Sequence, residues 1–270
     1  MLPPVVDVAW WRAAGGDVRL ADVRWYLDGR SGRAAYDAGH LPGAVFVDLD
    51  RWLAAPGSPA EGRHPLPDPA VFAVGMAALG IGDDTTVVAY DDAGGSVAAR
   101  LVWLLRVTGH EAALLDGGLA AWDGPLEQAA PDVAPAVFTP RPWPAERLAG
   151  VPDVLDPATV VVDARDPARF RGEHEPVDPR AGHVPGAVNV PHRGNLDADG
   201  RFLPAGALRE RFAAAGVTGE DPVVVYCGSG VTACHDLLAL ELAGLPAGRL
   251  HAGSWSQYSS DPDRPVATGD

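Results

Sequence analysis

The chain of 270 residues is long enough for two domains, and its 47% hydrophobic residues and near-zero mean hydropathy allow each a buried core. It has no apolar run near the roughly 20 residues of a membrane span and no signal-peptide pattern at its start, so we expect a cytoplasmic protein. The net charge of −15 argues against nucleic-acid or membrane partners, and because all 21 basic residues are arginines, lysine Schiff-base chemistry is excluded.

Short β-branched runs alternate with segments of helical periodicity along the chain. In the first half, a strand is predicted at 86–90 and a helix at 96–108. In the second half, strands are predicted at 160–163, 187–190, 222–226 and 249–251, and helices at 204–215 and 231–243. This alternation indicates an α/β fold, in which a mainly parallel β-sheet is flanked by helices. In such folds the active site lies at the carboxyl ends of the strands.

Two copies of one sequence unit make up the chain. The segment GHLPGAV at 39–45 recurs as GHVPGAV at 182–188, and three further matches follow the same order. We therefore predict two tandem domains, at 1–127 and 152–266. The segment 128–151 is rich in proline, which discourages helix and sheet, and is predicted to be a linker.

The strand predicted at 222–226 leads into the loop CGSGVTA, residues 227–233, and then into a helix. Glycines permit a tight turn here, so Cys227 is expected at the strand tip, surrounded by backbone N–H groups. Such surroundings at a helix N-terminus favour a nucleophilic thiolate. The backbone groups expected to hold the anion are those of Gly228, Gly230, Val231 and Thr232. The Thr232 hydroxyl either donates to the anion or caps the helix.

The first copy holds Asp91 at the position of the cysteine, so we expect only the second domain to be catalytic. A cysteine-phosphatase loop needs an arginine at position 233, where this chain has Ala233. Cys227 and Cys234 lack the paired spacing of a zinc site, so no metal is expected. Cys234 is interpreted as a small core residue.

These residues resemble the tandem-domain rhodanese superfamily, and the loop at 227–233 resembles the active-site loop of its 3-mercaptopyruvate sulfurtransferases. Both GHxPGA segments, the segment RFRG at 169–172 and LDGG at 115–118 also fit. The resemblance implies two rhodanese-like domains with the active site in the second. It further implies sulfur transfer through a persulfide on Cys227, without a metal or an organic cofactor.

The resemblance also implies roles for residues outside the loop. An arginine at the position of Arg169 binds the small anionic sulfur donor in this family. A second arginine is often found eight residues after Phe170, where this chain has Asp178, so we expect Arg180 to substitute for it. By motif position, Asp50 and His64 form a proton relay with Ser229. His40 and His183 occur in both copies and are therefore interpreted as structural.

The resemblance favours transfer of sulfur from 3-mercaptopyruvate to cyanide or to a thiol such as thioredoxin. Thiosulfate is the alternative donor, although family members that use it usually carry basic residues where this loop has Gly228 and Ser229. A third hypothesis is a persulfide carrier that a partner protein loads.

Overall fold

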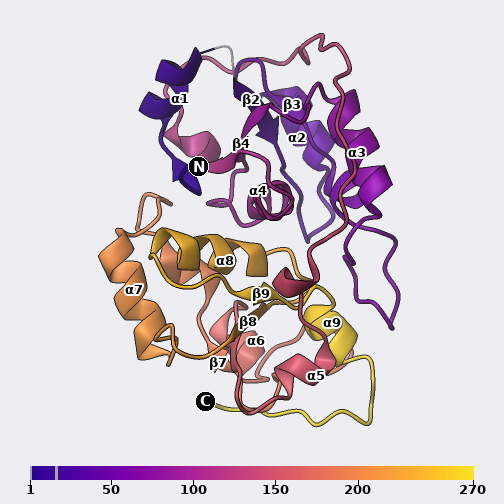
Figure 1. The fold of residues 1–270 in the computed structure, drawn as a ribbon, viewed down its shortest axis with the longest axis vertical. Helices are drawn as coiled ribbons and strands as arrows, with labels where there is room; N and C mark the ends of the chain where they lie inside the picture. The colour runs from indigo at the N-terminus through magenta and orange to yellow at the C-terminus, as the bar shows by residue number, and fades with distance from the viewer. Residues whose placement is uncertain (1, 16–17) are drawn as a thin grey trace. The chain divides into compact units, whose positions relative to one another are not determined.

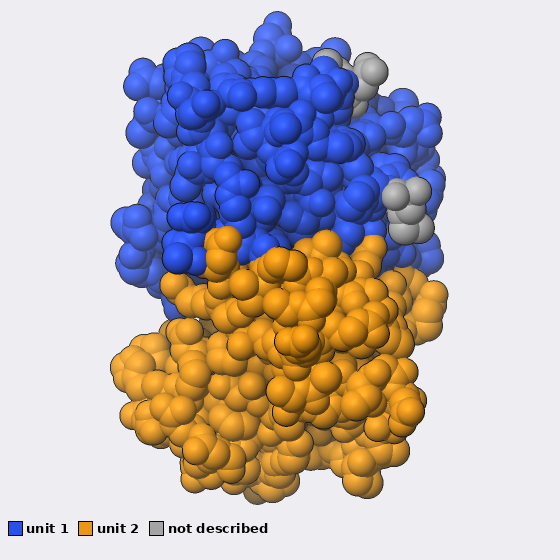
Figure 2. Space-filling model, turned by 90° about the vertical axis from the view of Figure 1, so that its left-hand side faces the viewer, with its two compact units in different colours: residues 1–55, 67–143, 198–202 blue, residues 56–66, 144–197, 203–270 orange. Residues whose placement is uncertain are grey.

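The structure, a computed structural model, describes residues 2–15 and 18–270 (Figure 1). The chain forms two compact units, coloured separately in Figure 2. Unit 1 comprises residues 1–55, 67–143 and 198–202, and unit 2 comprises residues 56–66, 144–197 and 203–270. The two units are therefore not contiguous in sequence, because a short segment from each half of the chain belongs to the other unit.

The described part of unit 1 contains a parallel sheet in the order β1-β5-β4-β2-β3. Its strands are β1 (Val5–Val6), β2 (Val18–Asp22), β3 (Val45–Phe46), β4 (Thr86–Tyr90) and β5 (Ala112–Leu115). Its α-helices are α1 (Val8–Ala14), α2 (Gly32–Ala38), α3 (Pro69–Ala78) and α4 (Ala98–Val107). Short turns of π and 3₁₀ helix lie at Leu49–Leu53 and Gly118–Ala121.

Unit 2 contains a second parallel sheet in the order β7-β6-β8-β9. Its strands are β6 (Val160–Asp163), β7 (Val188–Asn189), β8 (Val223–Tyr226) and β9 (Arg249–Leu250). Its α-helices are α5 (Val151–Val154), α6 (Pro167–Phe170), α7 (Ala205–Ala214), α8 (Ala233–Leu242) and α9 (Ser254–Tyr258). Every residue of the central strand β8 is buried, as its continuous apolar sequence predicts.

The predicted α/β fold with parallel sheets and flanking helices is confirmed in both units. The strands predicted at 86–90 and 160–163 have the predicted bounds, and the other predicted elements are one or two residues shorter at one or both ends. The two long helices that follow β4 and β8 begin two residues late, at Ala98 and Ala233. In unit 1 the N–H groups of Val97 and Ala98, which have no acceptor within the helix, donate to the Asp91 side chain.

One buried ion pair is repeated in the two units. Asp163 ends β6, and its carboxylate pairs with Arg165, which also donates to the Gly182 carbonyl at 2.7 Å. In unit 1, Asp22 and Arg24 make the same pair, and Arg24 donates to the Gly39 carbonyl at 2.8 Å. Each pair is fully satisfied by hydrogen bonds, as a buried charge requires, and fixes the GHxPGA segment to the end of a strand.

The histidines of the two GHxPGA segments have the predicted structural role. His40 Nδ1 is hydrogen-bonded to the Tyr36 carbonyl, and His183 Nδ1 to the Phe170 carbonyl. Each imidazole also stacks on the aromatic ring of the same partner, with centroids 3.8 Å and 3.7 Å apart. These contacts tie a loop to the preceding helix in both units.

The first part of the proline-rich segment predicted as a linker packs on unit 1. Phe138 is buried and meets the ring of Phe72 edge-on, and Trp143 Nε1 donates to the Pro67 carbonyl. Aromatic residues therefore anchor residues 128–143 to unit 1, whereas residues 144–151 belong to unit 2. None of the helices that the structure describes is long and apolar enough to cross a bilayer.

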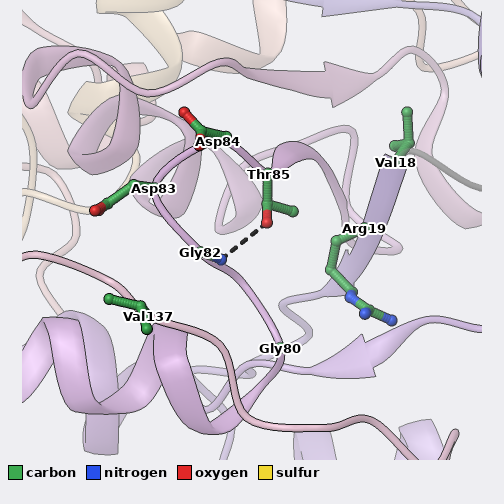
Figure 3. A pocket seen from close by; sticks show the side chains of 8 residues that line it. All are labelled: Val18, Arg19, Gly80, Gly82, Asp83, Asp84, Thr85 and Val137. Carbon is green, nitrogen blue, oxygen red and sulfur yellow. Dashed lines mark hydrogen bonds between the residues drawn. The ribbon is translucent and has the colours of Figure 1, made fainter.

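A pocket of unit 1 lies at the amino ends of β2 and β4, whereas Asp91 follows the carboxyl end of β4 (Figure 3). Thr85 Oγ1 accepts the Gly82 N–H at 2.8 Å within it. The residues that line it are Val18, Arg19, Gly80, Gly82, Asp83, Asp84, Thr85 and Val137. No thiol is among them, so this pocket is not the predicted cysteine site.

The loop after β4 encloses the carboxylate of Asp91. Its Oδ1 accepts the N–H groups of Ala93 and Gly95, and its Oδ2 those of Val97 and Ala98, all at 2.8–2.9 Å. Burial raises the pKa of Asp91, while the four N–H groups act in the opposite direction. The N–H groups of this loop thus form an anion-binding nest, and the anion that they bind is the Asp91 carboxylate of the same loop.

Asp91→Ala should lower the free energy of unfolding by about 2–4 kcal/mol, because four N–H groups, three of them in buried hydrogen bonds, lose their acceptor. The neighbouring Asp92 is exposed and accepts the Tyr26 hydroxyl, so Asp92→Ala should cost less than about 1 kcal/mol. Urea unfolding of both variants measures the difference. Equal losses in the two variants would show that the nest does not depend on its carboxylate.

Candidate active site

Cys227 lies at the tip of β8, the position that corresponds to Asp91 in unit 1. The residue is 1% exposed, and its Sγ accepts the Gly230 N–H at 3.1 Å. Gly230 has a φ of +79°, and a Cβ there would lie 2.5 Å from the Ala252 carbonyl oxygen, so only glycine fits. The expected tight loop that directs a backbone N–H at the sulfur is therefore present.

A serine with a strained backbone is hydrogen-bonded to the cysteine loop. Ser254 has a φ of +51°, and its Oγ accepts the Cys227 N–H at 3.1 Å and donates to the His251 carbonyl at 2.8 Å. A non-glycine residue in the left-handed region costs conformational energy, and such strain concentrates at functional sites. The backbone of Cys227 is thereby tied to the end of β9.

Ser229 and His64 meet beside the cysteine loop. His64 Nδ1 is 2.7 Å from Ser229 Oγ, although the two residues are 165 positions apart in the chain. His64 belongs to the segment 56–66, which comes from the first half of the sequence but is part of unit 2. The structure therefore brings together Ser229 and His64, which the resemblance assigned to a proton relay.

The segment 56–66 is docked on α9 by polar contacts. Gln257 Nε2 donates to the Ala60 carbonyl at 2.6 Å, and the Arg63 N–H donates to Ser256 Oγ at 3.0 Å. A Cβ at Gly62 would lie 2.5 Å from the Gly253 carbonyl oxygen, so the two backbones approach as closely as glycine allows. These contacts fix the position of His64 within unit 2.

Two guanidinium groups lie against Gly228, the residue after the cysteine. A Cβ at Gly228 would be 3.0 Å from Arg63 Nη2 and 3.4 Å from Arg169 Nη1. Arg169, on α6, pairs with Glu175 at 2.7 Å and with Asp178 at 3.2 Å. Arg63 pairs with the other oxygen of Asp178. The predicted donor-binding Arg169 is thus next to the loop, together with an arginine that the sequence did not single out.

The two acids of this cluster differ in acidity. Burial raises the pKa of Glu175, but hydrogen bonds from Arg169 and from the N–H groups of Asp178 and Val177 outweigh it, so its pKa is lowered. Burial dominates at Asp178 and raises its pKa, although Arg63 and Arg169 act in the opposite direction. Glu175 is therefore the firmer counter-ion of the cluster.

The remaining predicted residues make contacts of other kinds. Arg180 donates to backbone carbonyls between residues 258 and 264, including Ser259 at 2.9 Å and Arg264 at 2.8 Å, so the contacts of its guanidinium are with the main chain. Asp50, in unit 1, accepts Trp25 Nε1 at 3.0 Å. Thr232 is the N-cap of α8 but makes no side-chain capping hydrogen bond. Val231 is buried in the loop.

Sequence reasoning missed Arg63, Glu175, Asp178 and Ser254. Arg63 directly precedes His64, but a single arginine in a loop carries no signal of its partner. Asp178 stands where the family often has a second arginine, eight residues after Phe170, and this position gives no sign that it pairs with Arg63 and Arg169. The strain at Ser254 depends on backbone geometry, for which the sequence offers no signal.

A buried thiol at a strand tip, held by a backbone N–H, defines a cysteine-dependent site on a duplicated α/β fold. The sequence pattern described as the rhodanese-like domain matches residues 7–124 and 150–261. The chain belongs to the rhodanese-like family.

Similar proteins share nearly the full length of the chain. A Pseudomonas aeruginosa protein named a probable 3-mercaptopyruvate sulfurtransferase is 47% identical, over 96% of this chain and 95% of its own. A Mycobacterium tuberculosis protein provisionally named a thiosulfate sulfurtransferase is 42% identical, over 100% of this chain and 97% of its own. The crystal structure of SseA from Escherichia coli, described as a 3-mercaptopyruvate sulfotransferase, superposes with a TM-score of 0.82 at 34% identity and covers 93% of this chain and 98% of its own.

Acid should destabilise the site through His251, whose carbonyl accepts Ser254 Oγ. Burial lowers the pKa of His251 to about 4, while the unfolded chain has an ordinary histidine pKa of about 6.5. The unfolded chain therefore binds the proton first as the pH falls, and the contribution of neutral His251 is present above pH 6.5 and lost toward pH 4. The loss should reach about 3 kcal/mol.

The measurement is urea unfolding of the wild type and of His251→Gln between pH 7 and pH 4, roughly the interval that the two pKa values define. The difference in stability between the two proteins should shrink or reverse on acidification. A difference that stays constant with pH would contradict this role of His251.

Proposed function

We propose that this protein is a sulfurtransferase that takes sulfur from 3-mercaptopyruvate through a persulfide on Cys227. One observation carries the proposal: the Cys227 sulfur, held by the Gly230 N–H, lies in the same loop as a serine hydrogen-bonded to a histidine. The names of the Pseudomonas and Escherichia relatives support the same donor.

The loop around Asp91 in unit 1 supports a binding position for the outer sulfur of a persulfide on Cys227. An aspartate carboxylate oxygen and the outer sulfur of a cysteine persulfide are both two bonds beyond Cβ. In unit 1 the backbone loop binds the oxygens of Asp91 with four N–H groups. We infer that the corresponding loop of unit 2, from Gly228 through Gly230 and Val231 to Thr232, binds the outer sulfur of the anionic persulfide in the same way.

The reaction balances without a metal or an external oxidant. The Cys227 thiolate attacks the sulfur of 3-mercaptopyruvate, so an S–S bond forms and the C–S bond breaks. The electron pair of the C–S bond passes to carbon and leaves the enolate of pyruvate. The thiol proton of the donor is taken up and delivered to that carbon, and Ser229 with His64 provides the path. An acceptor thiolate or cyanide then attacks the outer sulfur and releases the Cys227 thiolate.

We propose a thiol such as thioredoxin, or cyanide, as the acceptor. Cys227 and Cys234 form no disulfide in the described part of the chain, which suits a reducing compartment, and we propose the cytoplasm as the place of the reaction. Asp50 as the group that orients His64 stays a prediction, for which Asp50→Asn is the test. Arg180 as a donor-binding residue also stays a prediction, and Arg180→Gln would test it.

Thiosulfate is the second candidate donor, because two guanidinium groups lie beside Gly228 and the Mycobacterium relative is provisionally named for it. Its leaving group, sulfite, is a stable anion and needs no proton. A persulfide carrier loaded by a partner protein would instead turn over both small donors slowly. Steady-state kinetics with both donors separate these functions.

Cys227→Ser should abolish sulfur transfer from either donor, because the nucleophile is lost. Cys234 is buried, and its thiol donates only weakly to the Gly230 carbonyl at 3.4 Å, so Cys234→Ser should keep most of the activity. Release of pyruvate and formation of thiocyanate from cyanide measure both variants. Full activity in Cys227→Ser would exclude the proposed persulfide.

Ser229→Ala should lower turnover of 3-mercaptopyruvate by about 10²-fold, which is the usual contribution of one acid–base group. Turnover of thiosulfate should change less than about tenfold, because its leaving group takes no proton. The same variant thus carries its own control. Equal losses with both donors would assign Ser229 to the persulfide rather than to the proton path.

A further inference from the structure

Arg63 and Arg169 converge on one face of the cysteine loop from different parts of unit 2. Arg63 comes from the segment 56–66, and Arg169 from α6. The nitrogens nearest to Gly228 are Arg63 Nη2 and Arg169 Nη1. Neither nitrogen takes part in the ion pairs of these two arginines, which use Arg63 Nη1 and Arg169 Nε and Nη2. Each guanidinium therefore keeps an N–H edge directed at the loop.

Asp178 bridges the two arginines. Its Oδ1 accepts from Arg63, and its Oδ2 is 3.2 Å from Arg169 Nη2. The Asp178 side chain is 2% exposed, against 28% for Arg63 and 15% for Arg169. Asp178 is a buried carboxylate with one partly exposed arginine hydrogen-bonded to each oxygen. It therefore holds both guanidinium groups in place more firmly than a surface ion pair would.

We propose that Arg63 and Arg169 together form the clamp for the carboxylate of the sulfur donor, with Asp178 as the residue that positions them. This inference rests on the proposed function and adds to it a residue, Arg63, that determines donor binding. A planar guanidinium suits a carboxylate, and two such groups beside Gly228 bring the bound anion next to Cys227.

The charge of the cluster sets its preference between anions. Arg165 also pairs with Glu175 and in turn with Asp163, so the connected cluster holds three arginines and three acids and is close to neutral before the donor binds. A donor with one carboxylate then leaves one negative charge, whereas the thiosulfate dianion leaves two. The clamp should therefore favour the monoanionic donor, and removal of one acidic charge should shift the preference toward the dianion.

The first test is the Michaelis constant of Arg63→Gln for 3-mercaptopyruvate. We expect KM to rise about tenfold or more with kcat changed less than about threefold, because a carboxylate contact acts on the ground state and the transition state alike. Discharge of the preformed persulfide to cyanide should be unaffected. The matched control is Arg171→Gln, since Arg171 pairs with Glu173 at the surface and should leave both steps unchanged.

Removal of Arg63 leaves a buried carboxylate, so a folding defect has to be separated from lost binding. The double variant Arg63→Gln/Asp178→Asn removes both charges and should fold, yet it should show the same rise in KM. Asp178→Asn alone should raise kcat/KM for thiosulfate relative to 3-mercaptopyruvate. A folded double variant with the wild-type KM would overturn the assignment of Arg63.

Alkylation of Cys227 reports on the clamp without turnover. In a Cys234→Ser background, the rate with iodoacetate, which carries a carboxylate, is divided by the rate with neutral iodoacetamide. This ratio should fall about tenfold in Arg63→Gln and in Arg169→Gln and stay constant in Arg171→Gln. A wild type that is inactive with 3-mercaptopyruvate but keeps this pattern would refute the proposed function and not the clamp. Normal turnover with an unchanged ratio and KM in Arg63→Gln would refute the clamp and not the function.

Discussion

In each unit, the loop after a central parallel strand, β4 or β8, directs backbone N–H groups at the side chain that follows the strand and requires an acceptor there. In unit 1 the carboxylate of Asp91 accepts four of them, and the loop is closed. In unit 2 a cysteine occupies the corresponding place, and the Gly230 N–H points at its sulfur. A thiol is one atom shorter than a carboxylate, and we infer that the outer sulfur of a persulfide on Cys227 takes the place that a carboxylate oxygen of Asp91 has in unit 1.

The surroundings of the nest are assembled from segments far apart in the chain. The segment 56–66 brings Arg63 and His64 to unit 2, where His64 meets Ser229 and Arg63 meets Asp178. Strain at Ser254 is a cost that the buried sheet of unit 2 has to offset. The protein has a net charge of −15, so its overall electrostatic field repels anions. Beside Gly228, however, two guanidinium groups lie together and make one position favourable for a small anion.

The sequence predicted the parts of this arrangement that depend on local pattern. The apolar strand before Cys227, the glycines of the loop and the repeated GHxPGA segments led to the α/β fold and to the position of the thiol. The hydrogen bond between His64 and Ser229 followed from the resemblance to known proteins and not from periodicity or charge. The partners of the arginines could not be predicted. Seven of the ten residues between Arg169 and Arg180 are polar, charged or proline, in no periodic order, so only the tertiary structure selects which acid each arginine meets. Arg63 was overlooked for the same reason, since its partner Asp178 is 115 residues away.

We propose that Cys227 takes one sulfur atom from 3-mercaptopyruvate and holds it as a persulfide. The sharpest test is mass spectrometry of the intact protein after incubation with 3-mercaptopyruvate and without an acceptor. We expect a gain of one sulfur atom, about 32 Da, located by peptide mapping on Cys227 and removed by cyanide. Release of pyruvate without this gain, or added sulfur on Cys234, would show that Cys227 is not the sulfur carrier.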